Sequence, residues 1–176
     1  MRYRRASIPG ATYFFTVNLA DRKSNLLIDH IEQLRDSVRK VRSAHPFESI
    51  AWVVLPDHMH AIWTLPEGDL NFPMRWNQIK GRFSRQISKH EVVRQSRIKK
   101  GERGIWQRRY WEHWIRNDDD LARHVDYIHF NPVKHGYARR AVDWRYSSFH
   151  RYVACGLLPK DWGVAGDWVG NYGEVV

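Results

Sequence analysis

The stretch SIAWVVLPDHMHAIWTL, residues 49–65, contains two runs that are rich in β-branched and aromatic side chains. Pro56 and Asp57 separate the two runs. This pair is typical of a turn, because proline presets the backbone angle φ and aspartate can hydrogen-bond to its own backbone. The stretch therefore predicts a β-hairpin with strands at residues 49–55 and 58–65.

The residues on the amino-terminal side of the hairpin predict a strand followed by a helix. Between residues 29 and 44 the apolar side chains recur at helical spacing, and Asp29 is in a position to cap that helix. Between residues 12 and 19 apolar and polar side chains alternate, which is typical of a half-buried strand. Its buried face would carry Tyr13, Phe15, Val17 and Leu19.

The residues on the carboxy-terminal side predict two further helices around an aromatic strand. Residues 71–97 are polar and basic, with an apolar side chain at every third or fourth position, which predicts a basic amphipathic helix. Residues 105–115 are aromatic-rich and strand-like. Asn117, followed by three aspartates, is expected to cap a last helix, because acidic groups are favourable at a helix amino terminus. Pro132 is expected to end that helix, because the residue before a proline is pushed away from helical angles.

The order of these elements, β-α-β-β-α-β-α, predicts the α+β class. We expect a ferredoxin-like antiparallel sheet with helices on one face. A chain of 176 residues is long enough for one well-buried domain and too short for two. The sequence therefore predicts one domain over residues 1–154, with residues 155–176 as a carboxy-terminal tail that packs on the domain.

The positive charge of the chain is concentrated in one stretch. The formal net charge is +10, and residues 75–109 alone hold twelve Lys and Arg against two Glu. Aromatic side chains are interleaved with these charges, a combination suited to phosphate attraction and base stacking. The stretch therefore indicates nucleic acid as a partner, although the charge alone fits a solvated basic helix equally well.

The composition excludes several other classes of protein. The single cysteine, Cys155, rules out an internal disulfide and a thiolate metal cluster. The longest apolar runs are too short to cross a bilayer, and no signal peptide is evident. We therefore expect a cytoplasmic protein with no membrane partner.

Two pairs of side chains indicate chemistry. His58 and His60 lie two positions apart on a predicted strand, so their imidazoles share a face with Cα atoms about 6–7 Å apart and can chelate a divalent ion. Tyr127 and Asn131 lie about one turn apart on a predicted helix and face the same way. The amide oxygen of Asn131 is a ligand that a hard ion such as Mg²⁺ accepts. Taken alone, each pair also fits a simpler reading, a chance pair of surface histidines or a tyrosine at the edge of the core.

Three motifs, LPDHMH at 55–60, WQRRYWEH at 106–113 and YIHFNPVKHG at 127–136, jointly resemble the REP-associated tyrosine transposases. That family belongs to the single-tyrosine branch of the His-hydrophobic-His (HUH) endonucleases, and the resemblance runs roughly from Arg4 to Tyr152. It implies the HUH endonuclease fold. It also implies a sequence-specific enzyme that cleaves and rejoins single-stranded DNA at repetitive extragenic palindrome (REP) hairpins through a 5′-phosphotyrosine intermediate.

The resemblance also assigns roles to individual residues. Tyr127 would be the nucleophile. Mg²⁺ or Mn²⁺ would be held by His58, His60 and Asn131, where insertion-sequence relatives usually carry glutamine in place of Asn131. Three side chains are expected to support the site without holding the ion: Asp57, His113 and His124. The charge pattern, and not the resemblance, gives the expected DNA contacts, which are Arg4, Arg5, Arg75, Lys80, Arg82, Arg85, Lys89, Arg108 and Arg109.

The resemblance further implies a bacterial, nucleoid-associated protein, with a monomer favoured over a dimer. Two alternatives remain open. One is a replication initiator or relaxase of the same superfamily, although such proteins usually carry an additional ligand histidine and extra domains. The other is a non-catalytic basic nucleic-acid-binding module on a ferredoxin-like fold, which gives no reason for the tyrosine, the asparagine and the histidine pair to occur together.

Overall fold

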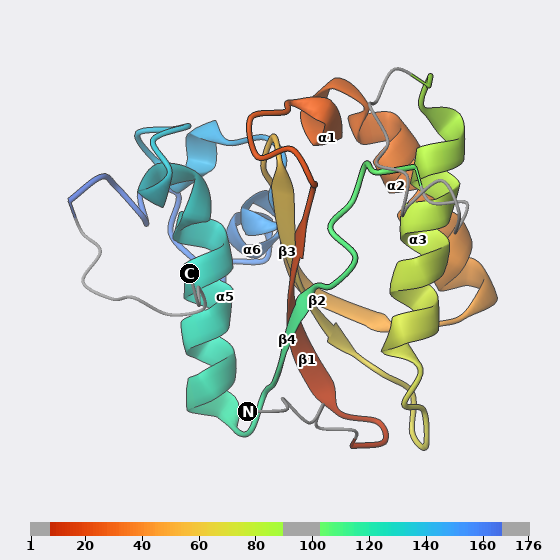
Figure 1. Ribbon diagram of the computed structural model, residues 1–176. Helices are drawn as coiled ribbons and strands as arrows, with labels where there is room; N and C mark the ends of the chain where they lie inside the picture. Colours follow the sequence, from red (N-terminus) through yellow and green to blue (C-terminus); the bar gives the residue numbers. More distant parts are fainter. Residues whose placement is uncertain (1–7, 90–102, 167–176) are drawn as a thin grey trace, which may run out of the picture.

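The computed structural model describes residues 8–89 and 103–166, and at its centre lies a four-stranded antiparallel sheet (Figure 1). The strands are β1 (Thr12–Asn18), β2 (Glu48–Val54), β3 (His58–Thr64) and β4 (Trp111–Trp114). They lie in the order β2-β3-β1-β4, and every neighbouring pair is antiparallel. The α+β class, the antiparallel sheet and the predicted hairpin, which is β2 and β3, are confirmed.

Helices cover both faces of this sheet, whereas the sequence predicted helices on one face (Figure 1). The long helices are α2 (Ile31–Ala44) and α3 (Phe72–Gln86) on one side and α5 (Asp118–Lys134) on the other. The reason is that β1 is apolar in both directions. Phe15 packs with α2 and α3, Phe14 packs with α5, and both rings are fully buried. The strand is therefore covered on both faces and is not half-buried.

The short helices are α1 (Leu26–Asp29), the 3₁₀ helix η1 (Ala141–Asp143) and α6 (Phe149–Ala154). Asp29 ends α1 and does not cap α2, whose N-cap is His30. No helix in the described part of the chain is long and apolar enough to span a bilayer.

The basic helix α3 ends at Gln86, eleven residues before the predicted end at Arg97, and residues 90–97 lie outside the described residues. Ile87 takes extended backbone angles at this point. The guanidinium of Arg103 then donates to the carbonyls of Ser84, Ile87 and Ser88, which satisfies acceptors that the end of the helix would leave without partners.

The start of α5 is capped reciprocally, as Asn117 and the aspartates after it predicted. Oδ1 of Asn117 accepts the backbone N–H of Asp120 at 2.9 Å. Oδ2 of Asp120 in turn accepts the backbone N–H of Arg116 at 3.1 Å. These bonds satisfy two donors at the helix start and fix the point from which α5 crosses the sheet.

The end of α5 differs from the prediction, because Pro132 lies inside the helix and the helix continues to Lys134. The stop is made by Gly136, whose φ of 73° is in the left-handed region. Its N–H bonds to the carbonyl of Val133 at 3.0 Å, and the N–H of Tyr137 bonds to that of Pro132 at 2.9 Å. This pair of bonds is a Schellman motif, which holds the last turn of α5 in place.

Candidate active site

The histidine pair stands at the start of β3, and both imidazoles lie on the α5 side of the sheet. The centroids of the His58 and His60 rings are 5.1 Å apart, and both side chains are buried. Met59 packs in the core on the opposite face, as the strand alternation predicted.

Each of these imidazoles is oriented through its Nδ1 atom. Nδ1 of His58 lies 2.7 Å from Oδ1 of Asp57, and Nδ1 of His60 lies 2.9 Å from Oγ1 of Thr16. Burial would raise the pKa of Asp57, but the hydrogen bond from His58 and the charge of Arg22, 3.1 Å away, hold it below its usual value. An ionised carboxylate only accepts hydrogen bonds, so the proton of His58 lies on Nδ1.

The two remaining ring nitrogens are what a ligand site requires. Nε2 of His58 and Nε2 of His60 are buried and have no hydrogen-bond partner among the residues that the structure describes. Burial foremost, and then positively charged neighbours, lower the pKa of His60 well below 6.5, so this ring is neutral near pH 7. A buried acceptor without a partner is costly. A divalent ion would take up both lone pairs, with Nδ1 of each ring held as metal-binding histidines usually are.

Helix α5 presents three residues to this pair at intervals of one turn. The ring centroid of Tyr127 lies 5.2 Å from that of His60, and the ring of His135, the C-cap residue, lies 5.2 Å from that of His58. Asn131 is one turn from each of them, so it faces the space between. Its Oδ1 and Nδ2 atoms are both buried, with no hydrogen-bond partner in the described part of the chain. Two imidazoles and one amide oxygen fit a divalent cation that keeps open positions for substrate.

Two residues at this end of α5 were missed by the sequence reasoning. His135 lies beside His58, and Lys134 holds its ammonium 5.0 Å from the centroid of the Tyr127 ring. Both are in phase with the predicted site, His135 four residues after Asn131 and Lys134 seven after Tyr127. Helical spacing was therefore the signal that could have found them.

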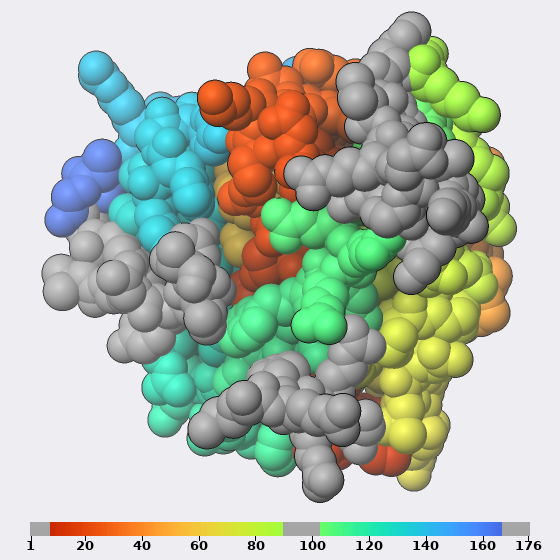
Figure 2. All heavy atoms as spheres, viewed as in Figure 1, coloured from red at the N-terminus to blue at the C-terminus, as the bar shows by residue number. Residues whose placement is uncertain are grey.

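The space-filling view shows a recess in the face that carries these residues. In Figure 2 the recess lies between α1, the segment that leads into β4 and the α5 side of the molecule, and atoms of β1 and β3 are visible at its floor. β3 carries the histidine pair and β1 carries Thr16. Atoms of the two strands thus reach the surface in this recess, while the side chains of His58 and His60 are themselves buried.

A second histidine cluster joins β4 to the start of α5. Nε2 of His113 lies 2.9 Å from Oδ2 of Asp120, and Nδ1 of His124 donates to the carbonyl of Asp120 at 2.7 Å. Their possible ligand atoms lie within 4.8 Å of one another, close enough to hold a metal ion, although here they bond to each other. The rings of His124 and His60 contact Phe14 at 4.9 and 5.4 Å, so one aromatic ring separates this cluster from the histidine pair.

The basic residues predicted to contact DNA occupy several environments. A hollow of about 770 Å³ lies between α3 and residues 103–108. Lys80 donates to the carbonyl of Gln107 at 2.7 Å and so ties this segment to α3. The hollow is lined by the cations of Lys80, Arg85, Lys89, Arg103 and Arg108 around the apolar side chains of Ile87, Ile105 and Trp106.

Two other predicted contacts, Arg109 and Arg82, are not among the residues that line this hollow. Arg109 is exposed on the segment that leads into β4. Arg82 lies on the α2 side of α3, where its charge adds to the effect of the hydrogen bond from Lys40 in lowering the pKa of Asp36. Arg4 and Arg5 lie outside the described residues.

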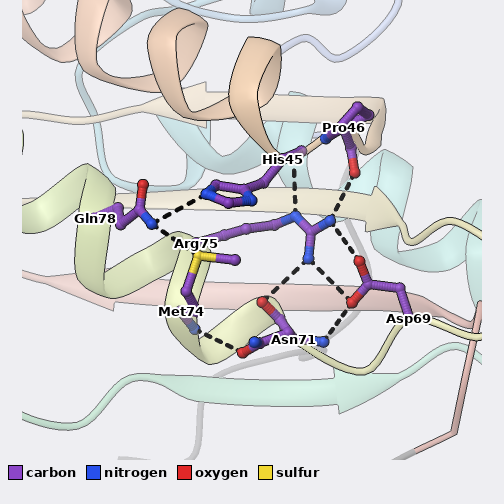
Figure 3. A network of polar contacts seen from close by, with 7 residues as sticks. All are labelled: His45, Pro46, Asp69, Asn71, Met74, Arg75 and Gln78. Atoms are coloured by element: carbon purple, nitrogen blue, oxygen red, sulfur yellow. Dashed lines mark hydrogen bonds and ion pairs between the residues drawn. The ribbon is translucent and has the colours of Figure 1, made fainter.

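Arg75 is buried, which contradicts its predicted role as a DNA contact (Figure 3). Its Nη atoms hold both carboxylate oxygens of Asp69, at 2.6 and 3.2 Å, together with the carbonyls of Asn71 and Pro46. Its Nε donates to the carbonyl of His45 at 3.1 Å. All five N–H donors of the guanidinium are therefore used inside the protein. They link α3 to the connection between α2 and β2.

His129 on α5 makes the folded protein sensitive to acid. Burial, together with the nearby charge of Arg151, lowers the pKa of His129 to about 3, while Nε2 bonds to Oγ of Ser148 at 2.9 Å. In the unfolded chain His129 binds a proton as the pH falls below about 6.5, whereas in the folded protein it does so only near pH 3. The free energy of unfolding therefore decreases as the pH falls from 6.5 toward 3. We expect this residue alone to cost about 2 kcal/mol between pH 7 and pH 5.

Urea unfolding of the native protein and of His129→Gln at a series of pH values measures this cost. The glutamine amide keeps a donor for Ser148 but does not titrate. Its free energy of unfolding should therefore fall less steeply below pH 6.5. His60 and His124, whose pKa values burial also lowers, act in the same direction in both proteins. If the free energy of unfolding falls equally with pH in the two proteins, His129 is not the cause of the acid sensitivity.

Comparison with known proteins places this geometry among transposases. The family described as "Transposase IS200 like" matches residues 9–131. A REP-associated tyrosine transposase of Escherichia coli (strain K12) is 52% identical over 165 residues, which are 94% of this chain and 91% of the relative. A relative from Haemophilus influenzae is 48% identical over 162 residues and covers 92% of each chain.

A solved structure, described as a REP-associated tyrosine transposase bound to a REP hairpin, has the same fold. It superposes with a TM-score of 0.84 at 49% sequence identity, over 100% of this chain and 98% of that one. At this identity and coverage, the likeness extends beyond fold class to the whole arrangement of sheet and helices.

Proposed function

This chain belongs to the IS200-like transposase family, and from that premise we propose that it cleaves and rejoins single-stranded DNA at REP hairpins, with Tyr127 as the nucleophile. One observation carries the proposal. The ring of Tyr127 lies 5.2 Å from that of His60, beside two buried Nε2 atoms that have no hydrogen-bond partner among the described residues. A tyrosine beside two nitrogen atoms that can bind a divalent ion suits metal-assisted phosphoryl transfer to the tyrosine.

In the proposed reaction, Oη of Tyr127 attacks the scissile phosphorus. The bond from Oη to phosphorus forms, the bond from phosphorus to the 3′ oxygen breaks, and the proton lost by the tyrosine is balanced by the proton gained by the 3′ oxygen. The products are a 5′-phosphotyrosine and a free 3′-hydroxyl. Because one phosphodiester replaces another, the 3′-hydroxyl of the same or another strand can reverse the step without an energy source.

A tyrosine hydroxyl ordinarily has a pKa of about 10 and is a weak nucleophile at neutral pH, so it needs help. His58 and His60 would hold a divalent ion through Nε2, and Asn131 through Oδ1. When bound, such an ion stabilises negative charge on the phosphate oxygens. Asp57 and Thr16 fix the two rings so that both lone pairs face the site.

We propose that bound DNA follows the hollow beside α3, and we call this path the DNA track. Its exposed cations, Arg85, Lys89 and Arg108, would attract phosphates. REP hairpins enter the proposal through the relatives, one of which is described in its complex with such a hairpin. Arg75 has no part in this track, because its donors are all engaged within the fold.

The salt dependence of hairpin binding tests whether DNA phosphates contact the cations of this hollow. Replacing Arg85, Lys89 and Arg108 with alanine should reduce the magnitude of the log–log salt slope by about 2, since each phosphate contact on single-stranded DNA contributes about 0.7. Cleavage at low salt should persist, because the three cations lie away from Tyr127. Fluorescence anisotropy of a labelled hairpin across a range of NaCl concentrations gives the slope.

The matched control removes the same charge from α2. Arg35, Arg39 and Lys40 pair with acidic residues on their own helix, and their replacement by alanine should leave the slope within error of the native value. Equal slopes for the two triple variants would mean that net charge, and not this hollow, attracts DNA.

The proposed activity is tested with a 3′-labelled single-stranded REP hairpin and Mn²⁺, because the 5′-phosphotyrosine joins the protein to the fragment that carries the 3′ label. A protein–DNA adduct that survives denaturation supports the transposase. A binding module would shift the hairpin without forming an adduct. The fully paired duplex should resist cleavage, because pairing hides base edges and stiffens the scissile strand.

We propose that the enzyme works as a monomer at the nucleoid of a bacterial cytoplasm. Tyr127 reaches the His60 of its own chain, so the described site needs no second subunit. We also propose one domain with a tail packed upon it. Within the described part of that tail, the ring of Trp162 stacks on Phe149 and meets Phe130 edge-on.

A further inference from the structure

Lys134, the last residue of α5, holds its ammonium over the ring of Tyr127. The distance from Nζ to the ring centroid is 5.0 Å. The side chain is only partly buried, so the ammonium can also meet a ligand that enters the site.

The helix explains why this lysine reaches the tyrosine. Seven residues advance about 10.5 Å along a helix and return to within about 20° of the same direction. Side chains lean toward the helix amino terminus, so the long lysine chain extends back over the preceding turns. The Schellman motif at Gly136 fixes this last turn, and a cation is favourable at a helix carboxy terminus.

The geometry places the same ammonium on the side of α5 that faces the metal-ligand residues. The Tyr127 ring that it covers lies 5.2 Å from the ring of His60. Asp57, which precedes the histidine pair, is engaged with His58 and Arg22. A phosphate that enters between Tyr127 and the histidine pair therefore meets the ammonium of Lys134, which lies 5.0 Å from the centroid of the nucleophile's ring.

Resting on the proposed role of Tyr127, we propose that Lys134 binds a non-bridging oxygen of the scissile phosphate and holds it in line with the tyrosine hydroxyl. Its positive charge offsets the negative charge that builds on the phosphate as Oη approaches. The lysine stays protonated throughout and forms no covalent bond. A purely structural role would not need the charge of Lys134, because its aliphatic chain alone can pack over the Tyr127 ring.

The test compares Lys134→Met with the native enzyme on two DNA strands that differ at one atom. One strand carries an ordinary scissile phosphate, and the other carries a methylphosphonate there, whose uncharged methyl group replaces one oxygen. On the ordinary strand the variant should form adduct about 100-fold more slowly. On the resolved methylphosphonate isomer that lacks the contacted oxygen, the ratio of native to variant rates should shrink to a few-fold.

Three comparisons complete the experiment. Lys134→Arg should recover part of the rate on the ordinary strand, because it restores the charge. Lys160→Met, at an exposed lysine in the tail, should match the native enzyme, and hairpin affinity should be similar in all variants. Equal losses on both strands would overturn the role of Lys134 while leaving Tyr127 as nucleophile. Absence of any adduct with the native enzyme would instead overturn the proposed function, and this inference with it.

Discussion

Tyr127→Phe is expected to abolish both strand cleavage and the covalent adduct, a loss of at least about 10⁴-fold, because no remaining atom of the side chain can bond to phosphorus. The phenyl ring keeps the contacts of the tyrosine with His60 and Phe14. Folding should therefore change little, and the affinity for the hairpin should survive. The measurement is adduct formation on denaturing gels, with anisotropy for binding and thermal unfolding for stability.

The matched control is Tyr137→Phe. Tyr137 is 45% exposed, and its ring lies 6.3 Å from that of His135, at the rim of the same site. If Tyr127 is the nucleophile, the Tyr137 variant keeps its activity. The reverse pattern, with cleavage retained in the Tyr127 variant and lost in the Tyr137 variant, would move the nucleophile to the rim and overturn the assignment.

The hairpin and its histidine pair were predictable because strand alternation is a local rule. Two histidines two residues apart must share a face, and Met59 between them must face the other way. What the rule does not supply is the partner of each ring. Thr16 meets His60 only because β1 pairs with β3 in one register, and that register depends on the whole sheet.

The second layer of helices was not predictable from β1 alone. Alternation in residues 12–19 suggested one buried face, yet Phe14 lies on the other face and needed a cover of its own. α5 supplies that cover and in doing so brings Tyr127 to the sheet. The signal was present, since a phenylalanine on the supposedly polar face of a strand is an argument for burial on both sides.

Two predictions were wrong for physical reasons, namely that Arg75 contacts DNA and that Pro132 ends α5. The charge of Arg75 says nothing of whether it is solvated, and Asp69 and three carbonyls together satisfy its guanidinium inside the fold. Pro132 removes one N–H and does not by itself stop a helix that packing holds on both sides. Its position directly after Asn131 breaks a local rule within the candidate site, where such exceptions are expected.

The histidine pair gives the second large expected effect. His58→Ala or His60→Ala should reduce cleavage below detection, and EDTA should do the same to the native protein. Each variant removes one of the two buried Nε2 atoms, so the ion would keep only one imidazole of the pair. Asn131→Ala should weaken activity less completely, because both imidazoles remain to hold the ion.

Metal binding itself provides a readout that does not depend on activity. An ion that binds only the folded protein should stabilise it by about 2.7 kcal/mol at one hundred times its dissociation constant. Mn²⁺ should therefore raise the unfolding temperature of the native protein but not that of His58→Ala or His60→Ala. The control is His150→Ala, since His150 is exposed and bonds to the carbonyl of Trp144. Nicking that continues in EDTA, or equal stabilisation of all four proteins by Mn²⁺, would remove the histidine pair from the metal site. In the second case the cluster of His113, Asp120 and His124, whose possible ligand atoms lie within 4.8 Å of one another, would become the place to look.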